Sequence, residues 1–144
     1  MTRSSQVIAR WLSYAGVLPP WVALALSGLL PSGWAPFAAL SYGAVIASFV
    51  CGMHWSAYMT AGVPLPTNLL ITSNIGALAV WALVLASFWS INLAFIGLVA
   101  VLAGLLFIDR QLLGAGAIDA WFWSVRRNAS LGLGAGLLVW GLFS

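Results

Sequence analysis

The sequence predicts an all-α membrane protein, folded as a bundle of five transmembrane helices. Three observations support this prediction: 63% of the 144 residues are hydrophobic, only 5% are charged, and the mean hydropathy is +1.08. Soluble domains are about a quarter charged, so this chain cannot cover a surface that faces water. The composition therefore excludes a soluble enzyme, a disordered chain and a nucleic-acid-binding protein, and it makes the lipid bilayer the expected partner.

Five apolar stretches are long enough to form the spans, because a transmembrane helix needs about 20 mostly apolar residues. Their continuous apolar character favours helices over the strands of a barrel, which alternate apolar and polar residues. The predicted spans lie within one transmembrane domain over residues 1–144, at residues 11–30, 36–59, 67–88, 91–108 and 126–143.

Two consecutive prolines, Pro19 and Pro20, interrupt the first span. A helix that began there would have about 10 residues and would cross only half of a ~30 Å hydrocarbon core. We therefore predict one kinked helix over residues 7–30, in which neighbours or water satisfy the carbonyls of Ala15 and Gly16. The basic N-terminus is also compatible with a signal peptide. No small-x-small cleavage site follows it, which favours a retained helix.

Short breaks separate the remaining spans. Residues 31–33 and 60–66 are rich in proline and glycine, which commonly mark turns between helices. The connection over residues 87–92 is so short that the third and fourth helices should lie antiparallel as neighbours. Residues 121–128 offer the fifth helix an extension at its N-terminus.

The charged side chains predict the orientation of the bundle. All five cations are arginines, and five alternating spans place them on the same side of the membrane: Arg3, Arg10, Arg110, Arg126 and Arg127. The positive-inside rule then puts the N-terminus inside and the C-terminus outside. We expect a multi-pass protein of the bacterial inner membrane, or of the mitochondrial inner membrane in a eukaryote.

Small residues predict where the helices meet, since they allow close backbone contact in a bilayer. Small residues four positions apart occur in three spans, at Ala44, Ser48, Gly52 and Ser56, at Ala100 and Gly104, and at Gly132 and Gly136. We interpret these positions as seams within the bundle. The alternative is that Gly132 and Gly136 face another membrane protein or a second copy of the chain.

Polar residues converge on the inner half of the predicted bundle, where any charge is costly and is a functional hypothesis by default. The candidate pocket contains the only histidine and groups from three further helices: His54, Asn68, Asn74, Asp109, Arg110 and Arg126. One interpretation is structural, with His54 satisfied by a neighbouring Asn or Asp and the arginines reaching lipid headgroups. The other is a pocket in which Asp109 partners His54 while Arg126 or Arg127 holds an anionic group.

The residue inventory predicts no cofactor, no metal and no catalytic residue. A haem would need a second ligand besides His54, such as Met53 or Met59, but neighbours on one helix cannot ligate opposite faces of one iron. A zinc site needs three or four ligands, which this chain can scarcely supply. A nucleophile pair of Cys51 and His54 in the apolar interior would lack a path for substrate, and one His with two Asp gives little support for proton conduction.

Four short motifs occur along the chain: Gly16-Val17-Leu18-Pro19, Tyr42-Gly43-Ala44 with Gly52-Met53-His54-Trp55, Asp109-Arg110, and Trp121-Phe122 with Arg126. Together they resemble the pattern of the domain-of-unknown-function family 3429, also described as transmembrane protein 69-like, over nearly the whole chain. The chain departs from that pattern at Cys51 and Ser56, where Gly is usual, and at Phe122, where Tyr is common. The resemblance implies a multi-pass inner-membrane protein without an established activity, and it marks His54, Asp109 and Arg126.

Two functions remain open. The first is a non-catalytic structural, assembly or accessory component of the inner membrane, which needs no reactive residue. The alternative is binding or transport of a small anionic or quinone-like molecule in a pocket at the inner leaflet around His54. A membrane enzyme is the least favoured class, and the chain shows no internal repeat of the kind that inverted-repeat transporters have.

Overall fold

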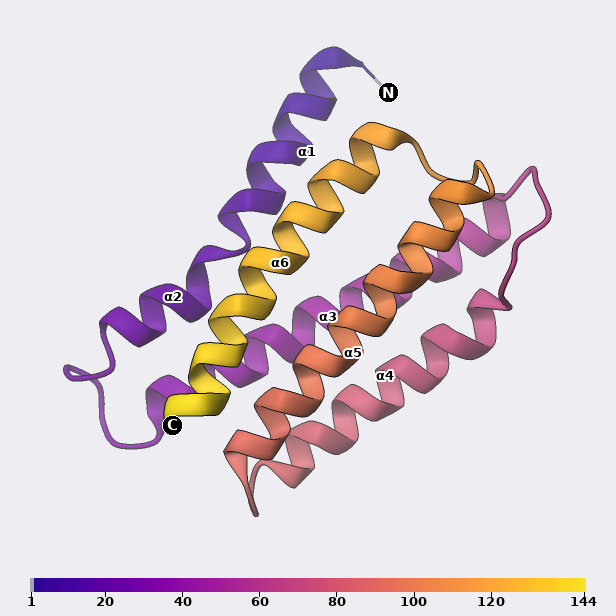
Figure 1. Cartoon of the computed structure of the whole chain (residues 1–144). Coiled ribbons are helices and arrows are strands. Elements are labelled where there is room, and N and C mark those ends of the chain that lie inside the picture. Colours follow the sequence, from indigo (N-terminus) through magenta and orange to yellow (C-terminus); the bar gives the residue numbers. More distant parts are fainter. Residues whose placement is uncertain (1) are drawn as a thin grey trace.

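Residues 2–144, the part of the chain that a computed structural model describes, form helices joined by turns (Figure 1). The helices are α1 Arg3–Ala15, α2 Leu18–Ala25, α3 Trp34–Thr60, α4 Leu69–Ala86, α5 Ile91–Gly114 and α6 Ala120–Phe143. This arrangement confirms the predicted all-α fold class.

The first predicted span consists of two helices instead of one kinked helix. α1 and α2 are separated at Gly16 and Val17, and Pro19 and Pro20 lie in the first turn of α2. Proline is tolerated there because the first N–H groups of a helix have no partner within it. The two helices together, Arg3–Ala25, are still long and apolar enough to cross a membrane.

Side-chain hydrogen bonds hold this broken segment against its neighbours. They run from Tyr42 Oη to the Gly16 carbonyl at 2.7 Å, from Trp21 Nε1 to the Gly132 carbonyl at 3.1 Å, and from Asn128 Nδ2 to Tyr14 Oη at 3.3 Å. The carbonyl of Gly16 is one of the two that we expected a neighbour or water to satisfy. Its partner is the hydroxyl of Tyr42 in α3, so the break between α1 and α2 is also where this segment is attached to α3.

Polar side chains define where α4 and α5 begin. The Asn68 side chain accepts hydrogen bonds from the backbone N–H groups of Leu70 and Ile71 at 3.1 and 3.4 Å, and Ser90 caps α5 through its own hydroxyl. Such caps satisfy N–H groups that a helix leaves unpaired at its start. The short turn between the two helices leaves them antiparallel and in contact, as predicted (Figure 1).

α5 and α6 are longer than their predicted spans. α5 continues past the expected end at residue 108 to Gly114, and α6 begins at Ala120 instead of residue 126. Asp109 and Arg126 therefore lie inside helices and not at helix ends. Their charges can lie there because the two side chains pair with each other.

α3, α5 and α6 form the core of the bundle. Leu40, Phe95, Leu98 and Leu137 are among the largest fully buried side chains. At Gly43, an added Cβ would lie only 2.9 Å from Leu137 Cδ1 and Leu98 Cδ2, so the absence of a side chain allows α3 to approach both neighbours closely. α4 packs against α3 and α5, α1 against α6, and α2 against α3 and α6 (Figure 1).

The predicted packing glycines differ in what they contact. A Cβ at Gly132 would lie 2.7 Å from Val17 Cγ1, and one at Gly136 would lie 3.0 Å from Trp21 Nε1. Both glycines thus face the α1–α2 segment of the same chain. The prediction was wrong for Gly52, which is exposed and faces open space: a Cβ there would meet no atom of a neighbouring described helix within 4 Å.

The outer surface of the helices is apolar, with exposed side chains such as Phe49 and Trp81. Four segments are long and apolar enough to cross a membrane: Arg3–Ala25, Trp34–Thr60, Leu69–Ala86 and Ile91–Gly114. Four such segments indicate a multi-pass membrane protein. α6, the fifth predicted span, is not among the four, since Arg126, Arg127 and Asn128 lower the hydropathy of its first half.

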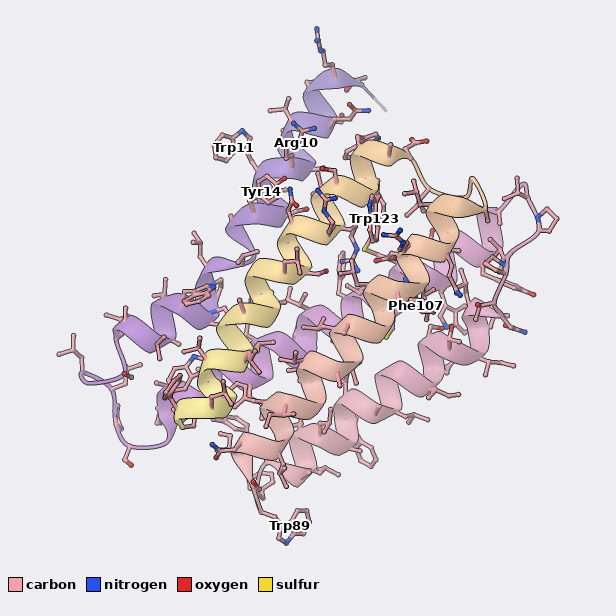
Figure 2. All side chains as sticks on the ribbon, in the orientation of Figure 1. Arg10, Trp11, Tyr14, Trp89, Phe107 and Trp123 are labelled. Atoms are coloured by element: carbon pink, nitrogen blue, oxygen red, sulfur yellow. The ribbon has the colours of Figure 1, made fainter. Side chains whose placement is uncertain are left out.

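Charged side chains gather at one end of the bundle. The starts of α1, α4 and α6 and the ends of α3 and α5 share this end (Figure 1). The five arginines and Asp109 belong to these helices, and Asp119 directly precedes α6. The opposite end holds the α2–α3 and α4–α5 turns and, within residues 2–144, no charged side chain. Arg10 and Trp89 mark the two ends in Figure 2. We call them the charged end and the uncharged end.

Candidate functional site

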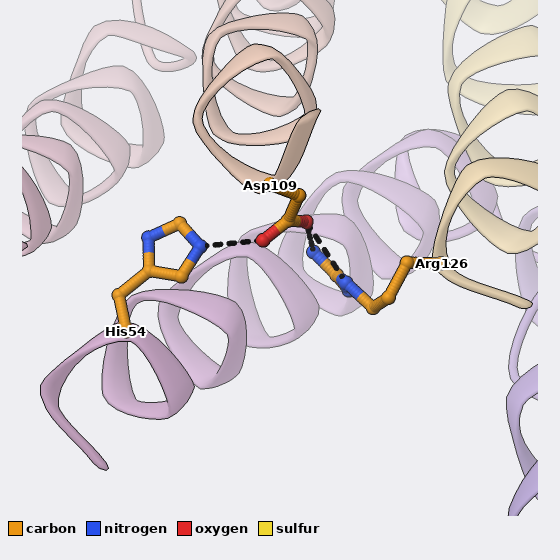
Figure 3. Close-up of polar contacts among 3 residues, drawn as sticks. All are labelled: His54, Asp109 and Arg126. Atoms are coloured by element: carbon orange, nitrogen blue, oxygen red, sulfur yellow. Dashed lines mark hydrogen bonds and ion pairs between the residues drawn. The ribbon is translucent and has the colours of Figure 1, made fainter. Parts of the chain in front are cut away.

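Three of the six predicted pocket residues meet in one buried cluster: His54 of α3, Asp109 of α5 and Arg126 of α6 (Figure 3). His54 Nε2 lies 2.8 Å from Asp109 Oδ1. Arg126 donates from Nε and Nη2 to Asp109 Oδ2 at 3.1 and 2.9 Å. We call these residues the buried triad. Because each member comes from a different helix, the triad joins the three helices of the core.

The triad is almost completely withdrawn from the surface. The side chains of His54 and Asp109 are each 3% exposed, and that of Arg126 is 14% exposed. Burying an unpaired charge costs several kcal/mol, but here the negative charge of Asp109 is balanced by the positive charge of Arg126. Both carboxylate oxygens have partners, so Asp109 is fully engaged by its neighbours.

The hydrogen bond to Asp109 determines the role of each nitrogen of His54. An ionised carboxylate only accepts hydrogen bonds, so Nε2 carries the hydrogen that it donates, and in the neutral ring Nδ1 is then an acceptor. Nδ1 is buried and has no hydrogen-bond partner among residues 2–144. Figure 3 shows it on the side of the ring away from Asp109. A buried acceptor without a donor is uncommon in folded proteins.

The local sequence explains why the triad is buried. His54 shares a helical stripe with Gly43, Ala47 and Cys51, and all four positions are buried. Tyr58, the next position on this stripe, is 38% exposed because α3 there approaches its end. The stripe therefore carries His54 into the contact between α3 and α5, opposite Asp109.

The other predicted pocket residues lie elsewhere. Asn68 is exposed and caps α4, Asn74 is exposed and donates to the Leu70 carbonyl of its own helix at 2.6 Å, and Arg110 is exposed. Arg110 and Asn74 each follow a buried residue directly. Since consecutive residues of a helix point about 100° apart, a buried position turns its neighbour away from the core.

Two cavities adjoin the triad. The smaller one, which we call the triad cavity, has a volume of about 240 Å³ and is lined by all three triad residues. The larger one, which we call the apolar cavity, has a volume of about 470 Å³ and lies among α1, α3, α5 and α6. Most of its lining is apolar. Val50, Met53, Phe122 and Arg126 line both cavities.

The apolar cavity was not predicted from the sequence. Its wall includes Ala9, Ser13 and Gly16 of the first segment and Ala129 and Ser130 of α6. Small residues at helical spacing on the first segment were the available signal, because such positions leave room beside a helix. These small residues did not indicate whether the space beside the first segment would be filled by another helix or left open.

The model of a family described as a protein of unknown function, DUF3429, matches residues 5–142. This match confirms the resemblance that the four sequence motifs indicated. No curated protein and no solved structure matches the chain.

Proposed function

This chain belongs to the DUF3429 family of proteins of unknown function, and we propose that it is a non-catalytic accessory or assembly component of an inner membrane. The buried triad carries the proposal. Asp109 uses both of its oxygens on His54 and Arg126, and its charge is balanced. A cluster in which the carboxylate is balanced and bonded in this way holds three helices together, whereas a general acid or base must reach a reactant.

The proposal includes five spans with the N-terminus inside and the C-terminus outside. α6 contains 24 residues, and at about 1.5 Å per residue it is longer than a ~30 Å hydrocarbon core. It packs against α5 and α3 in the same bundle. The five arginines at the charged end support an inner location for that end. A reporter fused after Ser144 should read as outside, and a cytoplasmic signal would contradict the five-span proposal.

Purification in a mild detergent tests the accessory role. An affinity-tagged chain, expressed at its natural level, should recover a second membrane protein in a fixed stoichiometric ratio by mass spectrometry. Arg127→Ala, which changes an exposed side chain outside the triad, is the control and should recover the same partner. A chain that is consistently recovered alone, although folded, would contradict the accessory role.

The triad cavity favours a second function, which is binding or transport of a small anionic or quinone-like molecule at the inner leaflet. The cavity is lined by the whole triad, and Nδ1 of His54 lacks a partner among the described residues. A cavity next to buried polar groups is the usual setting of a ligand site. This function is compatible with the first, since an accessory subunit can bind a small molecule.

Two variants test the second function. His54→Ala and Asp109→Asn should each abolish binding of the small molecule that co-purifies with the natural chain, while expression continues. Mass spectrometry of extracted small molecules measures the bound amount, and gel filtration checks that each variant is folded. Unchanged binding in both variants would exclude a ligand site at the triad.

A further inference from the structure

The apolar cavity and the triad cavity share four lining residues, and Arg126 is the charged one among them. From this juxtaposition we infer that the site binds an uncharged quinone, with the carbonyl-bearing ring beside Arg126 and a single hydrocarbon tail in the apolar cavity. The inference rests on the second proposed function, the ligand site, and names the chemistry of its ligand.

The apolar cavity suits a hydrocarbon tail. Its volume of about 470 Å³ lies within the roughly 300–1,000 Å³ that small-molecule sites occupy. Leu12, Val17, Phe49 and Leu133 are among the side chains that line it. Leu12 and Phe49 are 69% and 66% exposed, so the cavity opens onto the outer apolar surface of the bundle. Polar side chains are few in this wall, so a tail in the cavity would replace lipid contacts with equally apolar ones.

The polar end of the site offers hydrogen-bond donors. Asp109 takes one N–H group from Nε and one from Nη2 of Arg126, and a guanidinium carries five N–H groups in all. The remaining N–H groups are donors, and the hydroxyl of Ser130 in the apolar cavity is another. Donors of this kind recognise acceptor oxygens, which the carbonyls of a quinone supply.

The charge balance of the triad selects against an anionic head. Asp109 already neutralises Arg126, so a carboxylate or phosphate placed beside Arg126 would add a buried negative charge without a counter-charge. Such a charge is expensive in a buried site. An uncharged carbonyl accepts the same hydrogen bonds without this cost.

Aromatic side chains at the junction suit a flat ring. Phe122 lines both cavities, and Trp121 lines the apolar one. The two rings are 6.0 Å apart between centroids at an interplanar angle of 84°. A quinone ring can pack on the face or edge of such side chains, whereas the head of a monoacylglycerol has no ring to do so.

Binding of three amphiphiles with matched ten-carbon chains tests the inference. The purified full chain in detergent is titrated with a decyl-substituted benzoquinone, a decanoyl monoacylglycerol and a decanoyl lysophosphatidic acid, and bound ligand is measured by equilibrium dialysis. We expect saturable binding of the quinone, at least tenfold tighter than that of the other two. Equal or tighter binding of either acyl lipid would overturn the quinone inference and preserve the ligand site. Absence of binding by all three would overturn both.

Matched variants locate the bound quinone. Ala129→Phe fills the wall of the apolar cavity and should weaken quinone binding at least tenfold. Ala135→Phe, an exposed position on the same helix outside both cavities, should leave it unchanged. Ser130→Ala removes a donor without changing the packing and should weaken binding about fivefold, as expected for one hydrogen bond. Unchanged binding in the Ser130→Ala variant, or equal losses from the two phenylalanine variants, would overturn the placement.

Discussion

The charged end and the uncharged end of the bundle connect their helices with different chemistry. At the charged end, an aspartate links a histidine and an arginine from two other helices. At the uncharged end, Asn92 Nδ2 of α5 donates to the carbonyls of Gly141 and Ser144 at 3.0 and 2.8 Å. The second arrangement satisfies backbone carbonyls at the end of α6 with a neutral amide and buries no charge.

The same bundle thus joins helices in two ways, through neutral hydrogen bonds and through a charged cluster whose burial costs more free energy. Trp140 adds a neutral bond at the uncharged end, from Nε1 to the Pro20 carbonyl at 3.0 Å, and its ring stacks on Phe95. The side-chain bonds named at the uncharged end thus come from neutral groups. The charged cluster differs from these neutral bonds in its position, because it lies next to two cavities.

The largest expected effect comes from Asp109→Ala. This change leaves the Arg126 guanidinium buried without its partner, and breaking a buried pair in this way costs about 3–5 kcal/mol. Thermal denaturation in mild detergent, followed by circular dichroism, measures the loss of stability. Asp119→Ala is the control, because Asp119 is exposed and its side chain makes no capping hydrogen bond. Equal losses from the two variants would contradict the importance of the triad.

The coupling between Asp109 and Arg126 should be the next largest effect. Arg126→Gln leaves the carboxylate unbalanced, and Asp109→Asn leaves the guanidinium unbalanced, whereas the double variant is neutral. We expect the double variant to be more stable than the sum of the single losses predicts, by about 1–3 kcal/mol. The same denaturation experiment measures all three proteins. Additive losses would show that the two charges do not interact in the folded protein.

At the uncharged end, Asn92→Ala should have a smaller effect. It removes two hydrogen bonds to the end of α6 but leaves no charge behind, so we expect a loss of about 1–2 kcal/mol. Asn74→Ala is the matched control, because the exposed Asn74 side chain bonds only to its own helix. If Asn92→Ala destabilises the protein as strongly as Asp109→Ala, the contrast between the two ends fails.

Tyr42→Phe should have the smallest effect. It removes the hydroxyl that donates to the Gly16 carbonyl and leaves this acceptor at the helix break without a partner. A single hydrogen bond of this kind contributes about 1 kcal/mol. Differential scanning fluorimetry can resolve the shift, with Tyr58→Phe at an exposed position of the same helix as the control. A change no larger than that of the control would show that water replaces the hydroxyl.

The fold class was predictable, because continuous apolar runs of sufficient length leave few alternatives in a bilayer. The three triad residues were also among the six predicted, since intramembrane charges are costly and need partners. The sequence did not predict that Asp109, and not Arg110, would face the core, or that Arg126, and not Arg127, would do so. Neighbouring residues differ by about 100° around a helix, and where all faces are apolar the sequence does not reveal which face is turned inward.

The break in the first segment and the cavity beside it could not be predicted from the sequence for a related reason. Pro19 and Pro20 suit either a kink or a new helix start, and the outcome depends on partners such as Tyr42 that are distant in the chain. The apolar cavity depends on how far α1 stands from α3 and α6. Spacing along the chain carries little information about such distances.

The attachment of the first segment has a consequence for biosynthesis. Trp21 bonds to Gly132 and Pro20 to Trp140, across 111 and 120 positions of the chain. Synthesis proceeds from the N-terminus, so α1 and α2 reach the membrane long before α6 exists. The first helices are therefore made before their partner, and the wall of the apolar cavity is complete only after α6 has been synthesised.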